Sequence, residues 1–485
     1  MSLTVSNSEE AHRPDEPERP ARLRRSLRGW LKAGDGGRSA RAARPSIRPR
    51  TARFALGVLL IVLGVGRSWF QWDYGREFPD FLWPYTLSRM VVAGQNGYDR
   101  DQRMRTCAEV TNEEWCQRLH MQAYPPATGV VLVPLALLPW PIAKVAWFLI
   151  SVATPLGGLW YLLRAFVPGL SRGTVALVLG MVACSACVRW GVHVSQPATV
   201  VAGVLGIYLA AMLRHRSGLA ILCGLVALSL KMTSGLPFIG VAVFQRKWRV
   251  LGCFLGLWVA VNLLGAMQMG GLAALDGYRA NMAHVVEFRG IDSPDPHVGL
   301  VRLDLPYLLN AIHSDVQLSQ KLAVLLNLAA LLALVYEGWR ARAFATSPAV
   351  LAAFAAPLSC LSLLIVYHHY YEASLLLPSL LLMAVGPPEL RSLSARWCFI
   401  VPSALYFGLF TSPYGLGRGQ ALVGHFLGPG LYVYVKALGC AILVVGFLGS
   451  LGTLRRLVER ACARTPAPGR QGGSTAIELC SGRGS

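Results

Sequence analysis

The stretch SQPATVVAGVLGIYLAAMLRHR, residues 195–216, is an apolar run that follows Gln196 and stops at two arginines. Its central part, residues 197–213, has no charged side chain, and a run of about 17–25 such residues is long enough for a helix to cross a bilayer. Arg214 and Arg216 are typical of a cytoplasmic helix end, because basic residues are enriched on that side. A second apolar run follows at once, so the stretch predicts two consecutive membrane helices.

The whole chain has the composition of a polytopic membrane protein. Its 485 residues are 54% hydrophobic and 15% charged, with a mean hydropathy of +0.45. That balance is too apolar for a soluble core covered by a polar surface. We therefore expect an all-α fold with about 12 transmembrane helices, at residues 54–70, 142–165, 174–192, 197–213, 218–232, 234–245, 249–268, 319–338, 348–366, 373–386, 397–413 and 428–450.

The short apolar run 127–139 is not counted as a crossing. It contains Pro134 and Pro139, so a half-inserted or surface-lying helix suits it better. With this exclusion, basic residues fall at every second connection, which predicts that both termini are cytoplasmic. The basic residues of these connections are Arg164 and Arg172, Arg214 and Arg216, Arg246, Lys247 and Arg249, Arg340 and Arg342, Arg391 and Arg396, and Arg455, Arg456 and Arg460.

Three parts of the chain follow from this topology: a disordered basic cytoplasmic tail at 1–53, a transmembrane domain at 54–452 and a cytoplasmic C-terminal tail at 453–485. The net charge of +21 could suggest nucleic acid. However, the basic tail fits a positive-inside anchor near anionic lipid headgroups better. We expect a multi-pass protein of the plasma (inner) membrane whose partners include membrane lipids and not nucleic acid.

Two long polar connections, 71–126 and 269–318, then face the outside. The first holds eight of the 25 acidic residues, and loops of this length are uncommon unless they are functional or disordered. We interpret it as an ordered extracytoplasmic lid or floor. Cys107 and Cys116 lie in this loop, where an oxidising environment would permit a disulfide, although two free thiols remain an alternative.

Asp80 lies in this first loop, in the sequence PDFLWPY at 79–85, close to the end of the first predicted span. A carboxylate held beside aromatic side chains near a low-dielectric boundary gains proton affinity, as a general base near neutral pH requires. The alternative is structural, because aspartate is a favoured N-cap residue and could begin a helix over 81–93.

Three further polar residues are predicted near the same face. Lys231 closes the run 218–232, and its ammonium either reaches the headgroups or holds an anionic group such as a lipid phosphate. Gln196 begins the preceding span at its outer end. Tyr124 precedes two prolines that form a rigid entry into the short apolar run.

His368 and His369 lie between two predicted spans, with Tyr370 and Glu372 close behind. Three roles remain open for the histidines: metal ligation, interfacial anchoring, and acid–base or substrate contact. A metal site would need a third ligand nearby, because adjacent histidines on a helix point about 100° apart.

Taken in order, these segments resemble glycosyltransferase family 87, membrane enzymes of the GT-C superfamily that use polyprenyl-phosphate sugars. The resemblance covers roughly residues 54–390. It rests on five features in chain order. They are PDF at 79–81 with GYD at 97–99, YPP at 124–126 before a proline-broken helix, the span begun by Gln196, the span ended by Lys231 before RKWR at 246–249, and the pair His368-His369. Two departures concern the acceptor and the histidines: PHVGLVRLDLPYLLNA replaces an Asn-Gln-Ser motif, and Val366-Tyr367 replaces Trp-Asp.

The resemblance implies transfer of a hexose, with mannose favoured, from a polyprenyl-phosphate donor to a lipid or glycan acceptor, with inversion in a single displacement. Asp80 would be the base, His368 or His369 would serve the acceptor or the phosphate, and Lys231 would face the phosphate. No cofactor is required, and a divalent metal is optional. The further substrate-binding candidates are Tyr124, Gln196 and Tyr370.

Two other classes of protein were weighed against this enzyme. A transporter or lipid flippase also needs many spans, but such folds usually carry related halves and charges at the bilayer midplane. Neither feature is found in the sequence, where the polar candidates gather on one face. A non-catalytic assembly protein would explain the spans but not the shared face of Asp80, Lys231 and the histidines.

Overall fold

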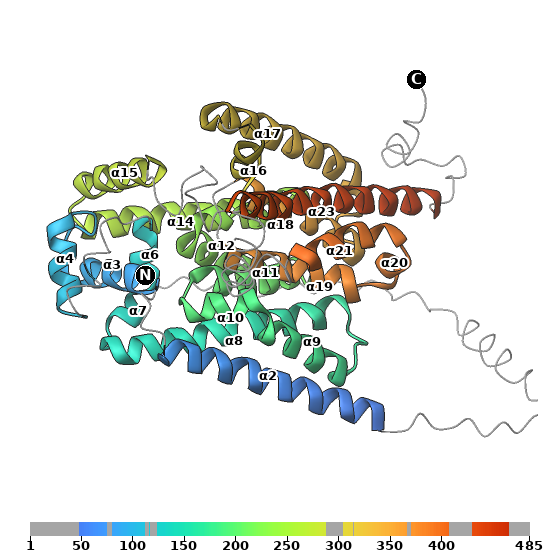
Figure 1. Cartoon of the computed structure of the whole chain (residues 1–485), viewed down its shortest axis with the longest axis horizontal. Coiled ribbons are helices and arrows are strands. Elements are labelled where there is room, and N and C mark those ends of the chain that lie inside the picture. The colour runs from blue at the N-terminus through green and yellow to red at the C-terminus, as the bar shows by residue number, and fades with distance from the viewer. Residues whose placement is uncertain are drawn as a thin grey trace, which may run out of the picture. The chain divides into compact units, whose positions relative to one another are not determined.

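The computed structural model describes residues 48–74, 80–111, 116, 124–287, 304–313, 315–365, 370–406 and 429–464. Within these residues the regular structure is entirely helical and includes no strand, as the sequence predicted (Figure 1). The described residues from Arg50 onward belong to one compact unit, which contains the helices discussed below except the first two residues of α2.

Six helices of the described chain are long and apolar enough to cross a membrane, each at a predicted span. The structure does not confirm the predicted number of about 12 spans. The bent pair α9 (Arg172–Cys184) and α10 (Ala186–His193), at 56°, makes a seventh if it counts as one span, and four apolar helices are shorter. The six lie in α2 (Arg48–Tyr74), α8 (Trp140–Phe166), α14 (Trp248–Gln268), α17 (Val316–Ala341), α18 (Pro348–Ile365) and α23 (Pro429–Arg464).

The remaining helices are short. The apolar run 127–139 is divided into α6 (Pro126–Val131) and α7 (Val133–Ala136), which confirms that it does not form a spanning helix. The others are α3 (Leu82–Ala93), α4 (Arg100–Ala108), α11 (Pro197–Leu213), α12 (Ser217–Leu230), η1 (Met232–Ser234), α13 (Leu236–Phe244), α15 (Leu272–Glu287), α16 (Leu305–His313), η2 (Arg342–Phe344), η3 (Tyr370–Leu376), α19 (Leu377–Val385), α20 (Pro388–Arg391), η4 (Ser394–Arg396) and α21 (Trp397–Leu405).

The helix α11 is the centre of the core, and almost all of its side chains are buried. Its backbone approaches that of α8 closely, because Gly203 of α11 lies against Gly158 of α8. A Cβ atom added to Gly158 would lie 2.1 Å from the carbonyl oxygen of Gly203, so only glycine fits there. Small residues at such crossings let membrane helices pack tightly. This packing explains why α11 is apolar on every side.

Hydrogen bonds join the basic connections at one end of the helices, which we call the basic end. These bonds link several of the connections to one another, and the placement of all of them on the cytoplasmic side stays a prediction. In Figure 1, α9 and α20 reach this end, while α3, α4, α6 and α15 gather at the opposite one, which we call the site end. The bonds run from Arg214 Nη2 to Arg164 O (3.0 Å), between Lys247 Nζ and His215 Nδ1 (3.1 Å), from Gln245 Nε2 to Ala345 O (3.0 Å) and from Arg460 Nη1 to Ser392 Oγ (3.2 Å).

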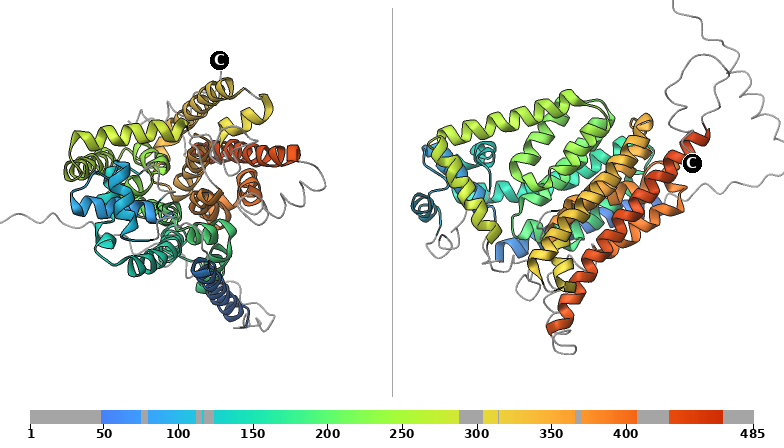
Figure 2. Two further views of the ribbon diagram at one scale, coloured as in Figure 1. Left: turned by 60° about the vertical axis from the view of Figure 1, so that its left-hand side comes forward. Right: turned by 90° about the horizontal axis from the view of Figure 1, so that it is seen from above.

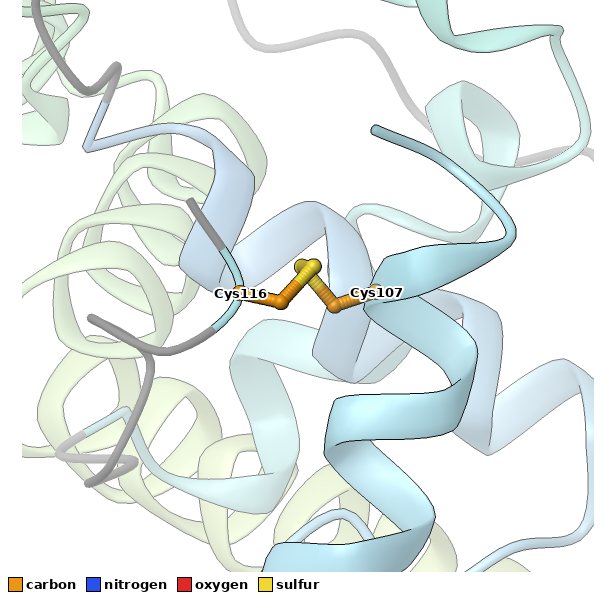
Figure 3. Close-up of a disulfide and its surroundings, with 2 residues drawn as sticks. All are labelled: Cys107 and Cys116. Carbon is orange, nitrogen blue, oxygen red and sulfur yellow. A yellow bond between two sulfur atoms is a disulfide. The ribbon is translucent and has the colours of Figure 1, made fainter. Parts of the chain in front are cut away.

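The helices of the first long loop, α3 and α4, pack beside the second one. Asn281 of α15 donates to the carbonyl of Tyr98 (3.4 Å), and the views of Figure 2 also place α15 near α4. The Cys107–Cys116 disulfide is formed, which decides the alternative left open by the sequence (Figure 3). Both cysteines are fully buried and cluster with Leu82, at the start of α3. The disulfide therefore supports the helix that follows Asp80.

Candidate active site

Asp80 is held at the site end by the segment between α10 and α11. Its backbone N–H donates to Val194 O (2.8 Å), and the side-chain amide of Gln196 donates to its Oδ2. The N-cap residue of α3 is Phe81, so Asp80 stands one position before the cap expected of it. The carboxylate is half-buried and is oriented by Gln196.

The neighbouring Phe81 anchors this segment in the core. Its ring stacks on Trp147 with a centroid distance of 4.6 Å and lies 5.9 Å from Trp140, both on α8. The Phe81 side chain is fully buried. Because Phe81 directly follows Asp80, this aromatic packing limits how far the carboxylate can move.

Ser195 forms the turn that presents Gln196. It has a φ of 60°, a left-handed conformation that is uncommon for a residue other than glycine. Two tryptophans stabilise the turn: Trp147 Nε1 donates to the Ser195 carbonyl (2.9 Å), and Trp72 Nε1 donates to its hydroxyl (3.3 Å). The Gln196 amide side chain is therefore set by contacts with two different helices.

Lys231 and Glu372 form an ion pair at the same end. Lys231 lies at the break between α12 and η1, where its φ of −157° ends the helix. Glu372 lies in η3. The Lys231 side chain is 18% exposed and that of Glu372 is 1% exposed. The cation therefore faces the surface more than its partner does.

Tyr124 lies just before α6, at the site end. Its carbonyl accepts a hydrogen bond from the Tyr98 hydroxyl (2.9 Å). Burial and the negative charges of Asp80 and Glu372 raise the pKa of the Tyr124 phenol well above its usual value. A tyrosine phenol is protonated at neutral pH, and the raised pKa extends the pH range over which it can donate a hydrogen bond.

Four of the seven predicted site residues, Asp80, Gln196, Tyr124 and Lys231, are thus assembled from separate segments. His368 and His369 lie outside the described residues, and of Tyr370 only the backbone at the start of η3 is described. Among the described residues, no three His, Cys, Asp or Glu side chains are placed to hold a metal ion.

Glu372 follows the histidine pair closely in the sequence, but no role was predicted for it. The sequence does contain an indication that Glu372 has a role, because it is the only acidic residue between Glu337 and Glu389. An acidic residue alone in an apolar region needs a partner, although the local sequence does not say which. The structure provides that partner in Lys231.

The sequence profile of glycosyltransferase family 87 matches residues 123–366. The chain belongs to glycosyltransferase family 87. The matched residues include Tyr124, Gln196 and Lys231, whereas Asp80 and Glu372 lie on either side of the match. This membership makes the family 87 protein a glycosyltransferase, and it favours the enzyme over the transporter or flippase.

Among solved structures, the chain is similar to ArnT from Cupriavidus metallidurans. The apo state has 16% sequence identity and a TM-score of 0.34, with 83% of this chain and 78% of that chain covered. The state bound to undecaprenyl phosphate has 16% identity and a TM-score of 0.31, with coverage of 85% and 81%. No curated protein sequence matches this family 87 chain.

The arrangement gives two carboxylates of the family 87 enzyme different environments. Asp80 is half-buried and receives a neutral amide donor, which orients it without adding a positive charge. Glu372 is buried and paired with the Lys231 ammonium. A half-exposed oriented carboxylate is suited to accept a proton, whereas a cation at a partly exposed helix break is suited to meet an anion.

Proposed function

We propose that the protein transfers a hexose, with mannose as the first candidate, from a polyprenyl-phosphate donor to a hydroxyl group of a lipid or glycan acceptor. The observation that carries this proposal is the oriented carboxylate of Asp80, held by Gln196 at the same end of the helices as the Lys231 cation. Family membership supports glycosyl transfer as the reaction class.

The proposed reaction is a single displacement. Asp80 takes the proton from the acceptor hydroxyl while the acceptor oxygen forms a bond to the anomeric carbon. The bond from that carbon to the phosphate oxygen breaks, and its electron pair stays on the phosphate. The anomeric configuration inverts, and the lipid phosphate leaves as an anion, so no general acid is needed.

The proposed location of this chemistry is the extracytoplasmic face of the plasma membrane. The basic end gathers Arg164, Arg214 and Lys247, which the positive-inside rule assigns to the cytoplasm. The site end would then open to the outer leaflet, where a lipid-linked donor is presented. Both termini would be cytoplasmic, and no cofactor is proposed.

The test is transfer of radiolabelled sugar from polyprenyl-phosphate mannose to a membrane lipid extract by the purified full chain. We expect Asp80→Asn to lower the turnover by roughly 10²–10⁴-fold, because it removes the base and nearly preserves the shape. Asp101→Asn is the matched control, since Asp101 is an exposed carboxylate in the same loop. Equal turnover in wild type and Asp80→Asn would refute the role of Asp80, and a donor panel with several sugars tests the choice of mannose.

A further inference from the structure

The ion pair between Lys231 and Glu372 carries a consequence for the release of product. Glu372 is fully buried in η3, where an unpaired carboxylate would be strongly destabilised, and its charge is stabilised by the Lys231 ammonium. The two residues come from distant parts of the chain, so the pair also holds η3 against the end of α12. Lys231, the more exposed partner, remains accessible to an anion.

The charge of the lipid phosphate changes during the proposed reaction. The donor is a phosphodiester with one negative charge, and the product is a phosphomonoester with a charge between −1.5 and −2 at neutral pH, about that of a phosphorylated side chain. A lysine without a counterion would attract the product more strongly than the donor, because the Coulomb energy grows with the charge. Such a site would retain its product.

We infer that Glu372 is a positioning residue that acts through Lys231 to weaken the binding of the lipid phosphate product and so to speed its release. This inference rests on the proposed function. Glu372 neutralises most of the Lys231 charge, and the phosphate must share the ammonium with a carboxylate that stays in place. The donor, with a single charge, is held well enough to react, whereas the product is not trapped.

Glu372→Gln tests this role, because it removes the charge and preserves the size of the side chain. We expect undecaprenyl phosphate to bind this variant roughly tenfold more tightly, which corresponds to about 1.4 kcal/mol. The value of kcat should fall together with KM, because slow release then limits turnover. Glu372→Asp, whose carboxylate is shorter by one methylene and lies farther from Lys231, should shift affinity in the same direction by roughly threefold.

The double variant Lys231→Gln/Glu372→Gln separates this role from a merely structural one. If Glu372 acts through Lys231, the tighter binding disappears when both charges are removed. Glu337→Gln is the matched control, because it breaks a partly buried ion pair with Arg340 on α17, and it should leave the affinity unchanged. Size-exclusion profiles identify variants that fail to fold. If Glu372→Gln fails to fold, the affinity of Glu372→Asp, which keeps the negative charge, tests the inference instead.

The outcomes distinguish this inference from the function on which it rests. Wild-type protein that transfers no sugar and binds no undecaprenyl phosphate would refute the proposed function and the inference together. Wild-type protein that binds and transfers, with Glu372→Gln and Glu372→Asp binding no more tightly, would overturn the inference alone. Tighter binding that persists in the double variant would also overturn it, because the effect would not pass through Lys231.

Discussion

The two ends of the helices use their charged and polar side chains differently. At the basic end, exposed side chains donate to a backbone carbonyl, as Arg214 does to Arg164, or to another exposed side chain, as Arg460 does to Ser392. At the site end, side chains from distant segments bond to one another, as Gln196 does to Asp80. Exposed bonds such as that from Arg214 to Arg164 compete with water and are weak, whereas the Gln196–Asp80 bond is partly buried and requires two particular residues. Replacing one residue should therefore have a larger effect at the site end than at the basic end.

The Cys107–Cys116 disulfide gives the largest expected loss of stability at the site end. Replacing both cysteines with serine should lower the free energy of unfolding by about 3 kcal/mol, because the cross-link restricts a short loop in the unfolded chain. Thermal unfolding of the purified protein measures this change. Cys253→Ser, at an exposed free cysteine of α14, is the control and should leave the unfolding temperature unchanged. An equal effect of the two changes would show that the disulfide does not support α3.

Gln196 tests whether the amide that orients Asp80 matters for turnover. Gln196→Leu removes a hydrogen bond to a charged group, which is worth about 1.5–3 kcal/mol, so kcat should fall roughly 10–100-fold. Gln245→Leu is the matched control at the basic end, where Gln245 donates to the carbonyl of Ala345 (3.0 Å). Sugar transfer at saturating donor measures both. Equal losses in the two variants would remove the distinction between the ends.

Arg214 gives the smallest expected effect. Its guanidinium is exposed, donates to Arg164 O (3.0 Å) and lies 4.9 Å from the centre of the Tyr161 ring. Arg214→Gln should cost about 0.5–1 kcal/mol of stability and leave kcat unchanged, because exposed contacts of this kind are weak. Thermal unfolding and the transfer assay check the two parts. A loss of turnover comparable to that of Gln196→Leu would place function at the basic end as well.

Much of the fold could be predicted because bilayer thickness sets the length of an apolar run. The bend at Ser185 was not predicted, because the run 174–192 is apolar enough for one span despite Arg189 and has no proline to mark a break. At that position the Ser185 hydroxyl donates to Val182 O (2.6 Å) and the backbone turns to a ψ of 143°, which separates α9 from α10. A serine in an apolar run does not by itself predict such a bend, because its hydroxyl can also bond within a continuous helix.

The candidate site could be predicted only residue by residue. Lys231 was recognisable because it is the one charged residue of the apolar run 218–232, and Asp80 because it lies among aromatic residues just after the first span. The alternative role of Asp80 as an N-cap is wrong by one residue, because Phe81 is the N-cap and contacts with Val194 and Gln196 hold Asp80 before it. The role of Asp80 as the base stays a prediction. The pairing of Lys231 with Glu372 joins segments far apart in sequence, and a local pattern cannot reveal it.

The distance along the chain between Lys231 and Glu372 also orders the assembly of the protein. Chains grow from the N-terminus, so the lysine is made and inserted well before its counterion exists. Until η3 arrives, water or lipid headgroups must solvate the ammonium. The last third of the chain therefore does more than add membrane anchors: it completes the charge balance of a site whose other parts are already made, and a nascent chain that stops before Glu372 is left with an unneutralised cation.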